Sequence, residues 1–504
     1  MAFLQQMMRL FVTSGVDSLL GINGFPKLIS CIVTEMSFLA GMVVQVSFMS
    51  RFKEVYTKAS FSLYLWGIKV VMPISHFVQR LRARNMVENC TPGTQERLSE
   101  ESLRLYVGID PTAPSLHIGS LAILMLLRQF QLAGHRPILL LGRATAMIGD
   151  PSFKGEERPL ISQEAIIAHQ VALEKQIRQL LEVSGAQGIQ LISNHEWWDQ
   201  MNIQAFLREI GKHFSVNEMK GKASVKDRLK GGISFAEFAY PILQAHDFFH
   251  LYHHYGVEMQ VGGGDQWGNI TSGIGLLRRR SQAKAYGLTV PLITQKNGLK
   301  FGKTESGNVW LDPKKTTSYQ FYQYLFNRDD NQAYRLLKQV TLTPLEEIEA
   351  LAAQHEAKAH KRLLQRKLAY AATTFVHGER AAQDAVRIND VLFGTVSPKM
   401  LTTLDEGIFE KGLAEMPRIE VEPQALSTCL SLAVFLSHTT GLQIFSSKRK
   451  AWEMILSGGV RINKVLYRDP ATKLPAVWLK EKYLLIQKGK RTHYLIVKKG
   501  ASLP

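Results

Sequence analysis

The chain has 504 residues, which exceeds the size of one typical hydrophobic core and predicts two or three domains. Its formal net charge of +18 favours a polyanionic partner, although a merely basic surface would give the same count. The three cysteines lie far apart and form no C-x-x-C pair, so neither a disulfide framework nor a structural zinc is expected, and a reducing cytosol fits.

Residues 1–71 differ in character from the rest of the chain. They contain six Lys and Arg against three Asp and Glu, with apolar runs at 37–49 and 61–71. Neither run reaches the roughly 18 to 20 apolar residues that a membrane span needs. The start lacks the basic residues of a secretory signal, and the acidic residues fit a transit peptide poorly. We expect a leader or a spurious N-terminal extension, with an organellar presequence as the alternative.

Strand-like and helix-like runs alternate from residue 75 to about residue 327, which is typical of an α/β fold with a doubly wound parallel sheet. A strand is predicted at 105–110, followed by a helix at 121–132 and a second strand at 137–141. His117 and Gly119 fall at the turn before this helix. Because a helix N-terminus presents free backbone N–H groups, this turn is a candidate phosphate site.

A second cationic stretch lies in a glycine-punctuated loop at 295–308. Lys300 and Lys303 stand three residues apart there, and Thr304 adds a hydroxyl. Either stretch alone is weak evidence, because a capped helix with an incidental histidine and a pair of solvated lysines are both common. Together they predict two halves of one nucleotide-phosphate site, with the lysine loop as a mobile clamp.

Three polar residues share one face of a predicted helix. Tyr240, Gln244 and Asp247 are spaced i, i+4 and i+7, so all three can point into one site. The alternative is a helix with a solvated polar face. Flanking phenylalanines disfavour that alternative, because they indicate that the helix is well packed.

A run of three glycines at 262–264 follows a strand-like segment and precedes Asp265 and Gln266. In isolation this run predicts only a tight turn. A glycine loop also lets a ribose come close, and a neighbouring carboxylate can accept hydrogen bonds from the ribose hydroxyls.

The composition and the predicted secondary structure of the remaining sequence change twice. Residues 328–400 are charged, rich in Ala and Leu and predicted to be helical, with one helix at 357–377. A linker with Gly and Pro follows at 401–425, and a last domain is expected at 426–504. From 448 to 499 there are 14 Lys and Arg against three Asp and Glu, on a regular helix and strand pattern. This pattern favours contacts to a nucleic-acid backbone over a merely soluble basic tail.

Six blocks fall in the order found in bacterial-type tyrosyl-tRNA synthetases of the class I aminoacyl-tRNA synthetase family, which the chain resembles from about residue 75 to residue 499. The blocks are LYVGIDPTA at 105–113, IGDPS at 148–152, GKHFSVN at 211–217, YPILQAHD at 240–247, GGDQWGN at 263–269 and KFGKT at 300–304. The resemblance implies a Rossmann-like catalytic domain at 72–327, a helical anticodon-binding domain at 328–400 and an alpha-L RNA-binding domain at 426–504. It also implies a tyrosine–tRNA ligase, which activates L-tyrosine with ATP and transfers tyrosine to the 3′ end of tRNA(Tyr).

The same resemblance assigns roles to individual residues. The catalytic residues would be His117, Lys300, Lys303 and Thr304. ATP would be bound by Gly119, Ser120, Gly263, Asp265, Gln266 and Lys303. Tyrosine would be bound by Tyr106, Asp150, Tyr240, Gln244 and Asp247, with Tyr106 and Asp247 on the phenol. Lys154 and Arg158 would contact pyrophosphate, and tRNA would be bound by Lys448, Arg449, Lys450, Arg461 and Lys464.

The expected partners follow from the same family. They are tRNA(Tyr), L-tyrosine, ATP with Mg²⁺ and a second copy of the chain in a homodimer. Neither a bound zinc nor a membrane is expected, and the cytoplasm is the expected compartment, with a mitochondrial or other organellar matrix as the alternative.

Three positions depart from the family pattern. Ser120 replaces the second histidine of the usual His-x-Gly-His signature, Gly264 replaces a serine, and Arg143 replaces a glycine. Other interpretations remain beside the leading one. They are a tryptophanyl relative, a small-molecule nucleotidyltransferase and a catalytically inactive synthetase-like RNA-binding protein. Tyr106 and Asp247 disfavour the first, the helical and basic domains disfavour the second, and the intact motifs disfavour the third.

Overall fold

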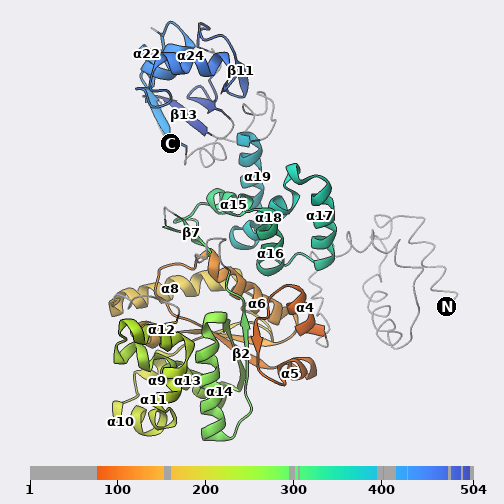
Figure 1. Cartoon of the computed structure of the whole chain (residues 1–504), viewed down its shortest axis with the longest axis vertical. Helices are drawn as coiled ribbons and strands as arrows, with labels where there is room; N and C mark the ends of the chain where they lie inside the picture. The colour runs from red at the N-terminus through yellow and green to blue at the C-terminus, as the bar shows by residue number, and fades with distance from the viewer. Residues whose placement is uncertain are drawn as a thin grey trace, which may run out of the picture. The chain divides into compact units, whose positions relative to one another are not determined.

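The computed structural model describes residues 76–152, 160–293, 301–304, 307–393, 401, 416–427, 429–474, 478–489 and 492–499 (Figure 1). The chain divides into two compact units, Met1–Val70 and Val71–Pro504, and every described residue lies in the second. The expectation of a leader at 1–71 therefore falls outside the described residues.

A six-stranded sheet organises the first part of the described chain, in the strand order β1-β6-β5-β2-β3-β4. The strands are β1 (Asn89–Cys90), β2 (Arg104–Ile109), β3 (Arg136–Leu141), β4 (Gln190–Ser193), β5 (Val257–Gly263) and β6 (Tyr286–Val290). Neighbouring strands are parallel except for β1, which is antiparallel to β6. The strand order reverses between β2 and β5, so the predicted doubly wound α/β fold is confirmed.

Helices cover both faces of this sheet. They are α4 (Phe77–Ala83), α5 (Thr94–Glu100), α6 (Leu121–Leu132), α7 (Arg143–Ala146), α8 (Gln163–Leu180), α9 (His195–Trp198), α10 (Ile203–Ala205), α11 (Val216–Gly221), α12 (Ala223–Gly231), α13 (Phe235–Tyr255) and α14 (Trp267–Ser281). Leu105 and Val107 of β2 join one core cluster with α6, whereas Tyr106 joins another with Phe248 of α13. Because successive strand residues point to opposite faces, α6 and α13 cover opposite faces. Figure 1 shows α13 and α14 side by side on one of them.

A helical part follows the sheet. Its helices are α15 (Ser318–Phe326), α16 (Asp330–Val340), α17 (Leu345–Ala357), α18 (Leu363–His377) and α19 (Glu379–Phe393). The sequence predicted one helix over 357–377, but α18 begins only at Leu363, after Arg362 with a left-handed φ of 52°. The Arg362 guanidinium donates to the carbonyls of Phe326 (2.7 Å) and Arg328 (3.1 Å). These hydrogen bonds hold Arg362 outside the helix.

The last part of the chain is built on a separate five-stranded sheet, in the order β11-β10-β12-β13-β9. Its elements are β9 (Arg418–Val421), α22 (Pro423–Ser427), α23 (Leu432–Val434), α24 (Lys448–Leu456), β10 (Val460–Ile462), β11 (Val465–Tyr467), β12 (Tyr483–Lys488) and β13 (Thr492–Lys498). Strand β9 pairs in parallel with β13, so the sheet takes a strand from the segment 401–425 that the sequence assigned to a linker. Ile419 and Val421 are buried in the core of this sheet, and two apolar residues were too short a pattern to predict a strand.

A buried ion pair fixes the start of α13. Arg228 Nη2 lies 2.6 Å from Glu237 Oε2, and the two side chains are 7% and 2% exposed. Glu237 stands in the first turn of α13, where the N-cap Ser234 side chain accepts from its backbone N–H. The pair therefore positions the helix that presents Tyr240 and Asp247.

Arg228→Met should lower the free energy of unfolding by about 3 to 5 kcal/mol, because it leaves the Glu237 carboxylate buried without its partner. The double variant Arg228→Met/Glu237→Leu removes both charges and should recover much of that loss. Urea unfolding followed by circular dichroism gives the three free energies. A loss below about 1 kcal/mol for Arg228→Met, the value of an exposed pair, would contradict the burial of this ion pair.

Candidate active site

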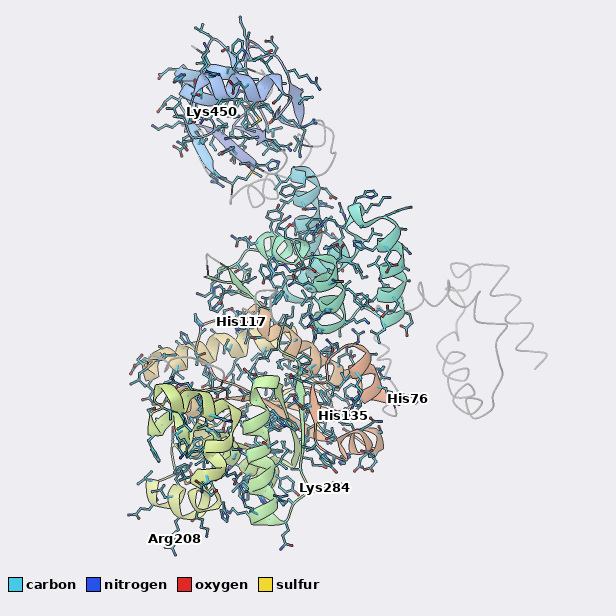
Figure 2. All side chains as sticks on the ribbon, in the orientation of Figure 1. His76, His117, His135, Arg208, Lys284 and Lys450 are labelled. Atoms are coloured by element: carbon cyan, nitrogen blue, oxygen red, sulfur yellow. The ribbon has the colours of Figure 1, made fainter. Side chains whose placement is uncertain are left out.

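The His117 segment and the segment after the lysine loop are joined by an isolated antiparallel β-bridge. The Ile118 N–H donates to the carbonyl of Val309 at 2.9 Å, and His117 forms an isolated β-bridge with Trp310. Figure 2 shows His117 at the margin of the sheet-containing part of the chain. The structure therefore brings together the two stretches that the sequence indicated as halves of one site.

Two glycines allow the backbones to approach closely at this junction. A Cβ built on Gly119 would lie 2.7 Å from the His117 ring and 3.3 Å from the carbonyl oxygen of Phe301. Gly302 has a φ of 95°, in the left-handed region that favours glycine. The Gly302 N–H donates to the hydroxyl of Tyr324 in α15 at 2.9 Å, which anchors the end of the lysine loop.

Most of the predicted cationic groups cannot be placed as side chains. Lys154, Arg158 and Lys300 lie outside the described residues. Lys303 and Thr304 are described in their backbone alone, as strand β7, which is antiparallel to β8 (Gly307–Asn308). The roles of these residues stay predictions.

The His117 side chain is exposed, and Ser120 is half-buried at the end of a 3₁₀ turn, Ile118–Ser120, that leads into α6. Both residues therefore lie at the turn that the sequence indicated. The 3₁₀ turn delays the start of the helix until Leu121.

Tyr106 of β2 and Asp247 of α13 are buried in the same face of the fold, at 0% and 2% exposure. The Tyr106 hydroxyl is buried and has no hydrogen-bond partner among the described residues. Burial, and secondarily the charge of Asp247, raises the pKa of Tyr106 well above its usual value, so the hydroxyl keeps its proton. A buried hydroxyl without a partner costs free energy. This position is therefore complementary to a polar group from outside the protein.

Three side chains donate hydrogen bonds to Asp247. The Trp197 and Trp198 indoles donate to Oδ1 at 2.9 and 2.7 Å, and Asn194 Nδ2 donates to Oδ2 at 3.1 Å. Burial raises the pKa of Asp247 to about 7, against the opposing effect of these three donors. Because each carboxylate oxygen can accept two hydrogen bonds, Oδ2 keeps capacity for one further donor.

Asp110, at the carboxyl end of β2, holds Tyr240 in place. The Tyr240 hydroxyl donates to Asp110 Oδ2 at 2.8 Å, and the Thr145 hydroxyl donates to Oδ1 at 2.8 Å. Burial, followed by the Asp110 charge, raises the pKa of Tyr240 well above its usual value. A Cβ built on Gly142 would lie 2.0 Å from Asp110 Oδ1, so this contact requires glycine at 142. Arg143, the departure noted above, is the first residue of α7 directly after this glycine.

A second polar network joins α13 to the start of α14. Gln266 Nε2 donates to Asp150 Oδ2 at 2.7 Å, and Gln244 Nε2 donates to Gln266 Oε1 at 3.2 Å. Asn269 Nδ2 donates to Gln244 Oε1 at 3.0 Å. Asp150 is 8% exposed and also accepts from the Ser152 N–H at 3.0 Å. A carboxylate and amide oxygens in this arrangement are complementary to an ammonium group.

The glycine turn lies at the carboxyl end of β5, beside the point where the strand order reverses. A 3₁₀ turn, Gly264–Gln266, follows β5, and a Cβ built on Gly263 would lie 2.7 Å from Asp265 Oδ1. The structure therefore brings Asp265 and Gln266 to the edge of the sheet that also holds Asp110. Ligands of open α/β sheets bind at this kind of position.

Four of the five basic residues predicted at the C-terminal sheet are exposed. Lys448, Arg449 and Lys450 lie in the first turn of α24, where Figure 2 labels Lys450, and Arg461 lies on β10. Arg449 is 88% exposed and lies 2.9 Å from Glu453. Lys464 differs, because its ammonium donates to the carbonyl of Leu392 and burial lowers its pKa to about 8.

The sequence analysis missed several residues of the site. Asp110 and Asn194 directly follow β2 and β4, and their position at carboxyl ends of parallel strands was a usable signal. Trp197 and Trp198 had no such signal, because only the tertiary fold brings α9 to Asp247. Within the described residues, no group of three or more His, Cys, Asp or Glu is placed to hold a metal ion.

Two family models match the chain. One, described as tRNA synthetases class I (W and Y), matches residues 98–394, and the other, described as a tyrosine–tRNA ligase SYY-like C-terminal domain, matches residues 409–496. The chain is 43% identical over 421 residues to a tyrosine–tRNA ligase of Amoebophilus asiaticus, covering 83% of this chain and 99% of that protein. A tyrosine–tRNA ligase of Bacteroides fragilis is 43% identical over 432 residues, covering 84% and 100%.

Solved structures give the same fold. A C-terminally truncated mitochondrial tyrosyl-tRNA synthetase of Aspergillus nidulans aligns with a TM-score of 0.57 at 26% identity, covering 68% of this chain and all of that one. The corresponding protein of Coccidioides posadasii aligns with a TM-score of 0.55 at 29% identity, covering 67% of this chain and 97% of that chain.

The raised pKa of Asp247 predicts a pH dependence of stability. The pKa rises from an ordinary 3.8 to about 7 on folding, so ionisation opposes folding and stability is lost as pH rises through 7. The free energy of unfolding of the wild type, minus that of Asp247→Asn, should fall by roughly 2 to 3 kcal/mol between pH 5 and pH 8. Urea titrations of both proteins across this range measure the difference. A difference that does not change with pH would contradict the prediction.

Proposed function

Because this chain belongs to the class I tRNA synthetases for tryptophan and tyrosine, we propose that the residues around Asp247 and His117 form one active site for L-tyrosine and ATP. The protein is a tyrosine–tRNA ligase. It activates tyrosine with ATP to tyrosyl-adenylate and pyrophosphate, and then transfers tyrosine to the 3′ end of tRNA(Tyr).

One observation supports the tyrosine assignment above all. The Tyr106 hydroxyl is buried near Asp247 and has no hydrogen-bond partner in the part of the chain that the structure describes, and Asp247 Oδ2 can accept a further hydrogen bond. A substrate phenol satisfies both groups at once, since its hydroxyl accepts from Tyr106 and donates to Asp247. Phenylalanine would leave both buried groups unpaired, and tyrosyl-tRNA synthetases are the standard illustration of this kind of rejection.

The other end of the amino acid fits the second network. We assign the substrate ammonium to Asp150, Tyr240 and Gln244, which supply a buried carboxylate and polar oxygens near one end of α13. Asp110 acts through Tyr240 by fixing its hydroxyl. With both ends held, the substrate carboxylate is oriented for attack on ATP, and orientation of this kind supplies a large part of such a rate enhancement.

The chemical steps need no protein nucleophile. The tyrosine carboxylate attacks the α-phosphorus, the bond to the bridging oxygen breaks and pyrophosphate leaves. A hydroxyl of the terminal tRNA ribose then attacks the tyrosyl carbonyl, and AMP leaves. Catalysis therefore depends on groups that stabilise negative charge on the phosphates in the transition state.

We assign that stabilisation to the paired segments at His117. His117, with Lys300, Lys303 and Thr304, would donate to the ATP phosphates, and Lys154 and Arg158 would contact pyrophosphate. Gly119 and Ser120 would face the triphosphate, while Gly263, Asp265 and Gln266 would hold the ribose. Glycine at 119 supports this role, because the absence of a Cβ lets the His117 ring and the Phe301 carbonyl lie close to its backbone.

Mg²⁺ is proposed to enter with ATP. Asp110, Asp150 and Asp247 each accept hydrogen bonds from protein donors, which is not the arrangement of a dedicated cation cage. Magnesium usually keeps several waters and bridges phosphate oxygens. It would neutralise charge on the leaving pyrophosphate.

A homodimer is supported by apolar side chains exposed in the segment 203–235. Ile203, Leu207, Val216 and Phe235 are 65%, 51%, 62% and 73% exposed. Exposed apolar side chains of this size favour burial against a partner, and a second copy of the chain is the occupant that the family suggests.

We propose the cytosol as the compartment, with a mitochondrial or other organellar matrix as the alternative. None of the described helices is both long and apolar enough to cross a membrane. The inactive RNA-binding alternative is not favoured, because relatives that share nearly their whole length with this chain are tyrosine–tRNA ligases.

The proposed activity predicts that tyrosine, of the twenty amino acids, supports ATP–pyrophosphate exchange. Tyr106→Phe should lower kcat/KM for tyrosine by roughly tenfold, because a buried hydrogen bond to the substrate phenol is lost. The same variant should change kcat/KM for phenylalanine little. Exchange with another amino acid in preference to tyrosine would refute the function. Unchanged selectivity in Tyr106→Phe would remove only that residue from the site.

The basic face of α24 predicts a separate effect on tRNA. The triple variant Lys448→Ala/Arg449→Ala/Lys450→Ala should raise the Kd for tRNA and make the slope of log Kd against log salt shallower by about 2 to 3. Tyrosine-dependent exchange should not change, since these exposed residues hold no substrate of that step. Lys284→Ala, which removes an exposed lysine of the sheet-containing part, is the control (Figure 2). Equal salt slopes for the triple variant and the wild type would contradict the assignment.

A further inference from the structure

A glutamate from another part of the chain covers the glycine turn after β5. Glu88 directly precedes the edge strand β1, and its N–H donates to the carbonyl of Thr289 at 2.7 Å. A Cβ built on Gly264 would lie 1.9 Å from Glu88 Oε2 and 2.7 Å from its carboxyl carbon. The Glu88 carboxylate therefore occupies the space that a side chain at position 264 would need.

Gly264 is also one of the departures from the family pattern, where serine is usual. This chain thus combines a missing side chain with a carboxylate in its place. The Asp265 carboxylate likewise lies in the space that a side chain at position 263 would need, because a Cβ built on Gly263 would lie 2.7 Å from Asp265 Oδ1. Two carboxylates therefore border consecutive glycines of the turn to which the ATP ribose is assigned.

We propose that Glu88 contacts the ribose of ATP. The Glu88 carboxylate accepts a hydrogen bond from one of the two vicinal ribose hydroxyls, and the Asp265 carboxylate accepts one from the other hydroxyl. This inference rests on the proposed function and adds one residue to its nucleotide site. An ionised carboxylate only accepts hydrogen bonds, so it suits a hydroxyl donor. Glu88 is exposed, and its carboxylate has no hydrogen-bond partner among the described residues, so it is free to accept.

The first test uses tyrosine-dependent ATP–pyrophosphate exchange with the full chain. Glu88→Ala should raise the KM for ATP roughly tenfold, the size expected for a lost hydrogen bond to a charged acceptor, without changing the KM for tyrosine. With one of the two nucleotides 2′-deoxy-ATP and 3′-deoxy-ATP, the variant and the wild type should have the same KM for the nucleotide. The hydroxyl that this nucleotide lacks is the one that Glu88 contacts. Glu96→Ala, at an exposed glutamate of α5, is the matched control and should leave both KM values unchanged.

The second test is a double-mutant cycle with the glycine. Because the group in the way is the flexible end of a glutamate, Gly264→Ser should displace the carboxylate rather than unfold the protein. It should raise the KM for ATP severalfold in the wild-type background. In the Glu88→Ala background it should add no further increase, since the group that it displaces is already absent.

Each outcome decides the inference. The inference would be overturned by an unchanged KM for ATP in Glu88→Ala. It would also be overturned if the increase in this KM persisted with both deoxynucleotides, or if added Mg²⁺ abolished the increase. Equal effects of Gly264→Ser in both backgrounds would also overturn it. A wild-type protein without tyrosine-dependent exchange would overturn the proposed function and this inference with it, whereas normal exchange with an unaffected Glu88→Ala overturns this inference alone.

Discussion

The burial of the Asp247 carboxylate constrains the whole amino acid site. A carboxylate removed from water is stable only when donors surround it, and here they come from α9 and from the residue after β4. Asn194 Nδ2 also donates to Thr145, which donates to Asp110, which accepts from Tyr240. One continuous set of hydrogen bonds therefore connects the residue assigned to the phenol with a residue assigned to the ammonium. A shift of β2 or β4 would therefore disturb the residues proposed for both ends of the substrate.

Glycine positions set the other half of the site. At Gly142 and Gly119, a side chain would collide with the functional groups themselves, so these positions keep space for Asp110 and His117. The strand-like pairing of Ile118 with Val309 then joins segments that are distant in sequence. The residues proposed for the nucleotide half are thus positioned by backbone contacts, whereas those proposed for the amino acid half are positioned by side chains.

The sequence was sufficient for most of the elements and for the position of several candidate residues, whose roles stay predictions. The bounds of α6 follow from hydrophobic periodicity, because they depend on a local pattern. The spacing of Tyr240 and Asp247 placed them on one helix face, as the structure has them. Long-range partners were not accessible in this way. Trp198 and Glu88 reach the site only through tertiary packing, and β9 is a strand only because β13 lies beside it.

The hydrogen bond from Gly302 to Tyr324 has a mechanical consequence. Tyr324 belongs to α15, its ring contacts Phe301, and Arg328 stacks over it, so Phe301 and Gly302 have a support in the helical part of the chain. Thermodynamic linkage makes such a support reciprocal. If binding of RNA to the helices changes the free energy of this contact, nucleotide binding at the loop must change RNA affinity by the same factor. Binding of the nucleotide and binding of RNA would then be coupled through the Tyr324 phenol, without direct contact between the two ligands.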